Sequence, residues 1–140
     1  MSQMQNTMRA ISTDILRLQR TSRTPEVVLD PQQKEFRIVG RSIPEDSVGF
    51  YQQVINWLER FRQMDQPADK LSLEVSLEYF NTSSSKCILD VFKQVNRIYT
   101  SGKPAEIIWM YDEDDEDLME MGEDYGELLD LPFHLKGVEY

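Results

Sequence analysis

The chain has 140 residues, of which 40% are hydrophobic and 29% are charged, a composition that suits one globular domain. Its 25 acidic and 15 basic side chains give a net charge of −10, which repels phosphate backbones and anionic lipids and argues against nucleic acid or a membrane as a direct partner. A single cysteine excludes an internal disulfide, and no apolar stretch has the length of a signal peptide core or a membrane span, so the sequence predicts a cytoplasmic protein.

The first 23 residues differ from the rest of the chain and are predicted to be an N-terminal leader. They are polar and basic, with four arginines and one acidic residue. Met8, Ile11, Ile15 and Leu18 fall at helical spacing. The leader is therefore either a short amphipathic helix that packs on a partner or on a second copy, or a frayed end. Residues 24–140 are predicted to form a single α/β domain.

A strand pair and a helix are predicted next. Residues 26–30 and the residues around Phe36 and Ile38 read as two strands of an antiparallel hairpin, joined by turn residues at 30–33. A helix is then expected to begin at Asp46 or Ser47 and to end before Pro67. Its apolar stripe consists of Tyr51, Val54, Ile55, Leu58 and Phe61.

Residues 71–79 alternate between apolar and polar side chains, which predicts a strand with one buried face. The apolar side runs from Leu71 to Tyr79, and the polar side consists of serine and glutamate. A central strand of a sheet covered on both faces would be apolar on both sides, so helices are expected to cover only one face of this sheet.

The second half of the chain continues the alternation of helices and strands. A strongly amphipathic helix is predicted over 84–100, and Gly102 and Pro104 follow it as stop signals. Residues 106–111 form an apolar strand, a third helix runs to about Leu129, and a last strand lies near 133–138. The predicted order is β-β-α-β-α-β-α-β, a mixed α/β sheet of about five strands with helices mainly on one face.

The sequence has few residues of the types that usually carry out catalysis. It therefore predicts a protein that is not an enzyme and has no catalytic residue. The one histidine, His134, lies in the last strand and reads as a structural or surface residue. Cys87 borders the apolar stripe of the second long helix and reads as a packed thiol. No phosphate-binding glycine loop, zinc motif or nucleophile beside a base occurs, and no cofactor or metal is expected.

An acidic run over residues 112–117 leaves two readings open. Clustered carboxylates bind hard cations, so one alternative is a divalent-cation-binding or metal-dependent protein. However, the run lies where a helix should begin, and acids in a first turn are stabilised by the helix dipole, so a solvated helix start is preferred. A further alternative is a dimeric scaffold that associates through residues 1–24 and an apolar surface at Trp109 or Met110.

The most specific feature is a run of hydroxyl residues between a strand and a helix, Asn81-Thr82-Ser83-Ser84-Ser85-Lys86. One hydroxyl suffices to cap a helix, by accepting a hydrogen bond from an unpaired backbone N–H, and the capping residue is expected to be a Ser or Thr. Four hydroxyls in a row exceed that need. A phosphate here would face free N–H groups and the positive end of the helix dipole, so capping and phosphorylation are both open from the residues alone.

The same residues carry a family resemblance. The segment 79–86 resembles the central motif of the SiaC-type bacterial regulatory phosphoproteins. The segments Thr24-Pro25-Glu26, 40–46 and 56–61 resemble the early strands and first helix of that family, and 111–117, 122–125 and Leu131-Pro132-Phe133 fit its C-terminal third. The likeness covers Thr24 to Val138, and the first 23 residues depart from it.

This resemblance implies a fold similar to that of anti-sigma-factor antagonists and a signalling role for residues 24–140 as a regulatory domain. It implies a phosphosite at Thr82. Asn81, Ser83, Ser84 and Lys86, which surround Thr82 in the sequence, are expected to bind partners. It further implies a cognate protein kinase and a PP2C-type phosphatase as partners, and an output enzyme such as a diguanylate cyclase, which links the protein to cyclic di-GMP and biofilm control. A homodimer is an open expectation.

Overall fold

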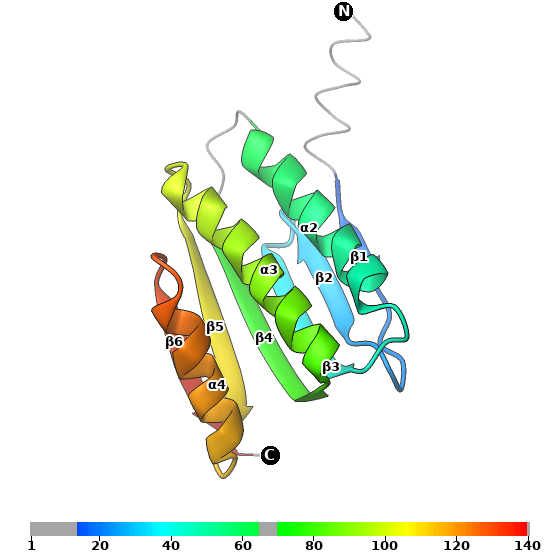
Figure 1. Ribbon diagram of the computed structural model, residues 1–140. Coiled ribbons are helices and arrows are strands. Elements are labelled where there is room, and N and C mark those ends of the chain that lie inside the picture. Colours follow the sequence, from blue (N-terminus) through cyan, green and yellow to red (C-terminus); the bar gives the residue numbers. More distant parts are fainter. Residues whose placement is uncertain (1–13, 65–69, 140) are drawn as a thin grey trace, which may run out of the picture.

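The structure of the protein is a computed structural model that describes residues 14–64 and 70–139. These residues form six strands and three helices in one layer of sheet and one layer of helices (Figure 1). The elements in chain order are β1 Leu16–Leu18, β2 Glu26–Asp30, β3 Glu35–Ser42, α2 Ser47–Gln63, β4 Leu71–Phe80, α3 Thr82–Thr100, β5 Ala105–Asp112, α4 Glu116–Glu127 and β6 Phe133–Val138.

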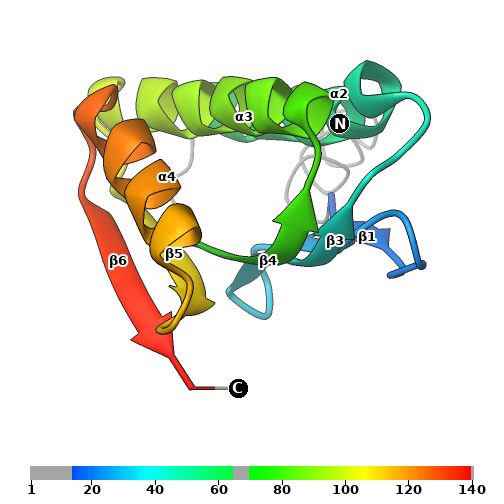
Figure 2. The same ribbon diagram turned by 60° about the horizontal axis from the view of Figure 1, so that its bottom comes forward.

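The sheet is mixed, and its strands lie in chain order from β1 to β6. β1, β2 and β3 are antiparallel neighbours, whereas β3, β4, β5 and β6 are parallel. Each parallel neighbour is reached through one helix, and α2, α3 and α4 all cover the same face of the sheet (Figure 2). The predicted α/β class and the one-sided helix layer are confirmed, and the strand count is six rather than about five.

The additional strand is β1, in the segment expected to be a leader. Leu16 pairs with Leu29 and Leu18 pairs with Val27, so the helical interpretation of this segment is wrong for residues 16–18. Arg17 on this strand donates a 2.7 Å hydrogen bond to the Asp30 carboxylate, which is almost fully buried. A buried carboxylate needs such a partner, and this requirement favours the strand. Met8 and Ile11 of the expected amphipathic segment lie outside the described residues.

The alternation along β4 is confirmed up to Leu77 and then shifts by one residue. Leu71 to Leu77 bury every second side chain under the helices, and the intervening serines and glutamates face away. Tyr79 was expected to continue the buried side, but it is 52% exposed and Phe80 is buried instead. The cause is an irregularity in the β3–β4 ladder, where Gly40 pairs with Leu77 and Arg41 already pairs with Tyr79.

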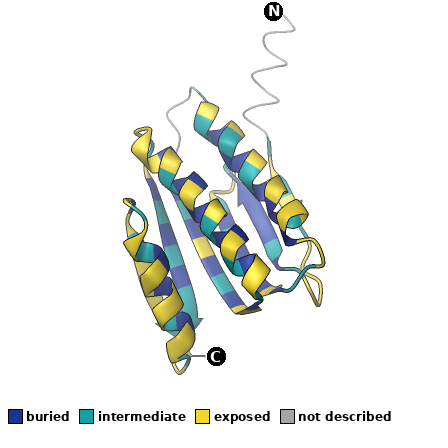
Figure 3. Cartoon of the chain, viewed as in Figure 1, coloured by how far each residue is buried: buried dark blue, intermediate teal, exposed yellow. Residues whose placement is uncertain are grey.

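The core lies between the sheet and the inner faces of the helices, whose outer faces are exposed (Figure 3). Trp109 on β5 packs against the rings of Phe92 and Tyr125 and is only 2% exposed. An interface at Trp109, as the scaffold alternative required, is therefore wrong. Gly122 allows α4 to approach this ring closely, because a Cβ atom there would lie 2.5 Å from Trp109 Cδ1.

Candidate functional site

The junction between β4 and α3 carries the hydroxyl run. Asn81 has an extended backbone, with φ −83° and ψ 174°, and its side chain accepts a 2.9 Å hydrogen bond from Ser84 N. Asn81 is therefore the N-cap of α3, and the expectation that a Ser or Thr side chain caps the helix is wrong. The Asn81 backbone N–H donates to Ser42 O at 3.1 Å, which fixes the junction to the end of β3.

Thr82 is the first residue of α3, and its side chain is exposed. Its hydroxyl has no hydrogen bond to any residue of the described part of the chain, while its carbonyl accepts a 2.7 Å bond from Ser85 Oγ. Lys86 lies one helical turn further on and is also exposed, so Thr82 and Lys86 share one face of the helix. The predicted phosphosite is thus accessible to another protein.

Ser83 connects the starts of two helices. Its hydroxyl lies 2.8 Å from Ser47 Oγ, the first residue of α2, and 3.2 Å from Asn81 Oδ1. The Ser83 proton donates to Asn81, so Ser47 donates to Ser83. The N-termini of α2 and α3 therefore lie side by side, at the carboxyl ends of the parallel strands β3 and β4. Both helix dipoles present their positive ends there.

Ser84 belongs to a buried chain of hydroxyl groups and has no exposed area. Ser84 Oγ donates to Ser42 O at 3.0 Å and accepts from Ser42 Oγ at 2.9 Å. The Ser42 proton is then used, so the Tyr51 hydroxyl, 2.6 Å away, donates to Ser42 Oγ. Burial raises the pKa of Tyr51 to about 12, which keeps this donor protonated. Ser84 is therefore a structural residue in this conformation, and its assignment to the partner-binding surface is corrected.

Two further exposed side chains border this end of the sheet and were not predicted as site residues. Tyr79 is exposed because of the ladder irregularity, and the Arg41 guanidinium carbon lies 6.0 Å from the centre of its ring. Gly40, with φ +133°, lies at the point where the ladder shifts. A glycine inside a strand often marks such an irregularity, so Gly40 was the residue in the sequence that could have indicated the exposure of Tyr79.

The start of α3 carries no charge of its own. No acidic residue lies in its first turn, so its free N–H groups face neutral hydroxyls. The neighbouring helix α2 is capped by a carboxylate, that of Asp46, which accepts a 3.0 Å hydrogen bond from Gly49 N. A phosphate on Thr82 would meet the dipole of α3 directly, and binding anions in this way is a general property of helix N-termini.

The other chemically notable groups are accounted for by the fold. Cys87 is buried, and this burial raises the pKa of its thiol, the opposite of an activated nucleophile. His134 is exposed on β6, and its Nε2 lies 3.0 Å from a Glu106 carboxylate oxygen. This agrees with the prediction of a structural or surface strand residue.

The acidic run begins a helix, as preferred from the sequence. Asp115 is the N-cap of α4, and its Oδ1 accepts from Leu118 N at 3.0 Å. Among residues 14–64 and 70–139, no three His, Cys, Asp or Glu side chains gather in a group suited to a metal ion. No helix of this part of the chain combines the length and apolar content needed to cross a bilayer.

Comparisons with known proteins agree on one family. A family model described as SiaC family regulatory phosphoprotein matches residues 18–138. An uncharacterized protein of Pseudomonas aeruginosa strain UCBPP-PA14 is 34% identical over 116 residues, which cover 83% of this chain and 90% of that protein. The crystal structure of apo-SiaC from Pseudomonas aeruginosa is 31% identical, with a TM-score of 0.79, and covers 89% of this chain and 99% of its own.

A second solved structure is a complex. It contains the diguanylate cyclase SiaD with its activator SiaC from Pseudomonas aeruginosa, and it matches with 32% identity and a TM-score of 0.80 over 88% of this chain and 99% of that one. The fold and the hydroxyl-rich helix start define a small α/β protein with an exposed threonine at one end of its sheet. The chain belongs to the SiaC family of regulatory phosphoproteins, as its resemblance to that family indicated.

Proposed function

We propose that this protein is a cytoplasmic adaptor without catalytic activity, switched by reversible phosphorylation of Thr82. A cognate protein kinase adds the phosphate, a PP2C-type phosphatase removes it, and the unmodified form binds an output enzyme. The observation that carries the proposal is the state of the Thr82 hydroxyl, which is exposed and has no hydrogen bond within the described residues. The neighbouring serine hydroxyls are all engaged in hydrogen bonds.

This difference between the four neighbouring hydroxyl groups supports Thr82 as the phosphate acceptor. Ser84 is sealed in the core, Ser83 is hydrogen-bonded to Asn81 and Ser47, and Ser85 is bonded to the Thr82 carbonyl. A kinase must reach the acceptor oxygen and use its lone pairs, and of these four residues Thr82 meets both conditions without breaking a hydrogen bond. Asn81, Ser83 and Lys86 remain as the proposed partner-binding residues around it.

The phosphate would act as a charge switch. It brings nearly two negative charges and three acceptor oxygens to a helix start that is otherwise neutral. A partner that packs on the neutral hydroxyls would have to bury an unpaired anion, which is costly. The exposed Lys86, one turn away, is placed to contact the phosphate, although an exposed ion pair contributes only about 0–1 kcal/mol. The modified form would thus lose the partner while its own helix start is stabilised.

A diguanylate cyclase is the proposed output enzyme. The support is the relative whose solved complex joins SiaC, as activator, to the diguanylate cyclase SiaD, and whose fold matches nearly the whole of this domain. Binding of the unphosphorylated adaptor would then raise cyclic di-GMP and favour biofilm formation. This assignment is separate from the identity of the acceptor residue, and each is tested by its own measurement.

The acceptor is tested by incubating the full chain with its cognate kinase and ATP and mapping the phosphate by mass spectrometry. We expect label on Thr82 in the wild type and none in Thr82→Ala. Thr100→Ala is the matched control, because Thr100 is an exposed threonine at the other end of the same helix. Label that persists in Thr82→Ala would overturn the acceptor assignment.

The switch is tested by binding and by cyclase activity. Thr82→Ala should bind the cognate diguanylate cyclase and activate it as the wild type does, whereas Thr82→Asp should bind at least about tenfold more weakly, since a desolvated unpaired charge costs more than 1.4 kcal/mol. Thr100→Asp adds the same charge elsewhere and should bind normally. Equal binding of Thr82→Asp and wild type would contradict the charge switch and leave the acceptor mapping intact.

A further inference from the structure

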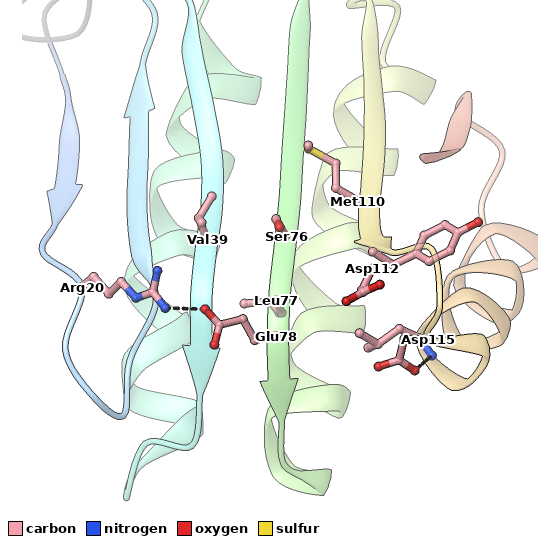
Figure 4. Close-up of a pocket in the computed structure, with 10 residues that line it drawn as sticks. Arg20, Val39, Ser76, Leu77, Glu78, Met110, Asp112 and Asp115 are labelled. Atoms are coloured by element: carbon pink, nitrogen blue, oxygen red, sulfur yellow. Dashed lines mark hydrogen bonds and ion pairs between the residues drawn. The ribbon is translucent and has the colours of Figure 1, made fainter. Parts of the chain in front are cut away.

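A cavity lies where two neighbouring strands of the sheet separate. The pairing of β4 with β5 ends at Ser76 and Met110, after which β4 continues along β3 to Phe80 and β5 continues along β6 to Asp112. The space between the diverging ends is a cavity of about 360 Å³. It opens on the face of the sheet that α2 and α3 do not cover, so it is not part of the Thr82 surface (Figure 4).

The walls of this cavity combine apolar surface with carboxylates. Val39, Met110 and Leu118 supply apolar side chains, and Glu78, Asp112 and Asp115 supply the acids. Sites that bind ligands or partner side chains typically have this composition, a mainly apolar concave surface with a few polar groups that set orientation. Three acids and one arginine line the cavity, so its occupant should be cationic.

The chain itself shows how the cavity holds a guanidinium group. Arg20, from the loop between β1 and β2, reaches across Gly40 and donates a 2.6 Å hydrogen bond to the Glu78 carboxylate (Figure 4). Its stem is so close to Gly40 that a Cβ atom there would lie 3.1 Å from Arg20 Nε. A long basic side chain with its stem on the strands and its charge on a carboxylate therefore fits one side of this space.

The opposite side of the cavity has acids without such a partner. Oδ1 of Asp112 accepts from Asp114 N and Oδ1 of Asp115 accepts from Leu118 N, each at 3.0 Å, which leaves the second oxygen of each carboxylate for a ligand. Neither acid forms an ion pair within the described residues, and Lys136, which pairs with Met110 across β5 and β6, does not line the cavity. The carboxylate on the β4 side of the cavity is thus paired with an arginine, whereas the two carboxylates on the β5 side are not.

We propose that this cavity is a docking site for a basic segment of a protein partner, which inserts an arginine or lysine between Asp112 and Asp115 and lays an adjacent apolar side chain on Met110 and Leu118. The inserted cation repeats on the β5 side the contact that Arg20 makes on the β4 side. The site goes beyond the Thr82 switch and is independent of it, because it opens on the other face of the sheet.

The test uses a blocked decapeptide of alternating arginine and leucine as the probe, titrated into the ¹⁵N-labelled full chain. The same peptide with glutamine in place of arginine and the polycation spermine are the comparison ligands. We expect the arginine peptide to shift the amide signals around Ser76, Met110 and Asp112, and we expect the other two ligands to bind at least about threefold more weakly. Thr82→Asp should leave this binding unchanged.

The variant Asp112→Asn/Asp115→Asn removes two charges while keeping both acceptor oxygens and an N-cap residue for α4. Its binding of the arginine peptide should fall about threefold to thirtyfold. The matched control Glu120→Gln/Asp124→Asn removes two exposed acids elsewhere on α4 and should bind like the wild type. Met110→Lys places a cation of the chain itself in the cavity and should abolish binding of the arginine peptide. If the double variant does not fold, this variant tests the docking site in its place.

Three results would overturn the proposal. Equal losses in the two double variants would mean that net charge attracts the peptide without a site. Equal binding of spermine would mean a general cation surface rather than a docking site for a protein segment. No shift around the cavity would mean that the arginine peptide does not enter it.

Discussion

α3 and α4 begin in the same way and differ in charge. Each follows a parallel strand and is capped by the side chain of an Asx residue, Asn81 for α3 and Asp115 for α4, which accepts a hydrogen bond of 2.9 or 3.0 Å from the backbone N–H three residues on. The first turn of α4 adds Glu116 and Asp117, whereas that of α3 has no acid.

This difference supports the proposal that the start of α3, rather than that of α4, carries the regulatory phosphate. The dipole of α4 is already compensated by fixed carboxylates, so a further negative charge there would meet repulsion. The start of α3 is neutral and is held by hydroxyl groups, so it has room for a charge that is added and removed. A neutral, hydrogen-bonded helix start is suited to a reversible charge, and a permanently acidic one is suited to attracting basic partners.

The largest effect should come from breaking the hydroxyl chain that attaches α3 to β3. Ser84→Ala leaves the buried Ser42 hydroxyl without its acceptor and should lower the free energy of unfolding by about 1–3 kcal/mol, measured by urea denaturation. Ser85→Ala removes a bond at the surface and should cost less than about 0.5 kcal/mol. Equal costs would mean that the buried chain does not hold the helix start.

The long elements of the fold and the short strand β1 differ in how far the sequence predicted them. The long amphipathic helices and the alternation of β4 were predictable because each has many apolar residues at one spacing, and their burial dominates the free energy. β1 was not predictable, since three residues carry little pattern and the strand depends on pairing with β2 and on Arg17 reaching the distant Asp30.

The candidate site was predictable in position but not in detail. A run of hydroxyls between a strand and a helix indicated the junction, and the family resemblance pointed to Thr82. Which hydroxyl is buried depends on Ser42 of β3, which bonds to Ser84, and on Tyr51 of α2, which bonds to Ser42. These residues lie 42 and 33 residues away from Ser84 along the chain, so only the complete fold brings the three together. The cavity between β4 and β5 was not predicted, because strand divergence depends on the ladder partners of each strand.

An exchange of charge between the two helix starts sharpens the comparison. Asn81→Asp keeps a capping oxygen and adds a negative charge to α3, which should raise the free energy of unfolding by about 0.3–1 kcal/mol at low salt. Asp115→Asn should change it by less, because Glu116 and Asp117 still compensate the dipole of α4. Thermal and urea unfolding at low and high salt measure both, and the gain from Asn81→Asp should shrink as salt screens the charge. Destabilisation by Asn81→Asp would show that the start of α3 does not favour an anion.

The smallest expected effect concerns the contact between α2 and the middle of α3, which involves charged side chains, unlike the neutral start of α3. Glu59 on α2 accepts hydrogen bonds from Arg62 and from Gln94 of α3, and Arg97 of α3 lies nearby at 3.9 Å. The hydrogen bond from Arg62, above all, lowers the pKa of Glu59 from 4.5 to about 2. Because the folded-state pKa is the lower one, the stability that this group contributes is present above pH 4.5 and is lost as the pH falls toward 2.

Glu59→Gln should therefore destabilise the protein slightly at pH 7 and flatten the decline in the free energy of unfolding between pH 4.5 and 2, measured by urea denaturation across that range. Ser84→Ala is the informative control, because hydroxyls do not titrate there and its curve should run parallel to that of the wild type. If Ser84→Ala flattened the acid limb and Glu59→Gln did not, the charged contact between α2 and α3 would lie elsewhere. A titrating group would then be coupled to the hydroxyl chain at the start of α3.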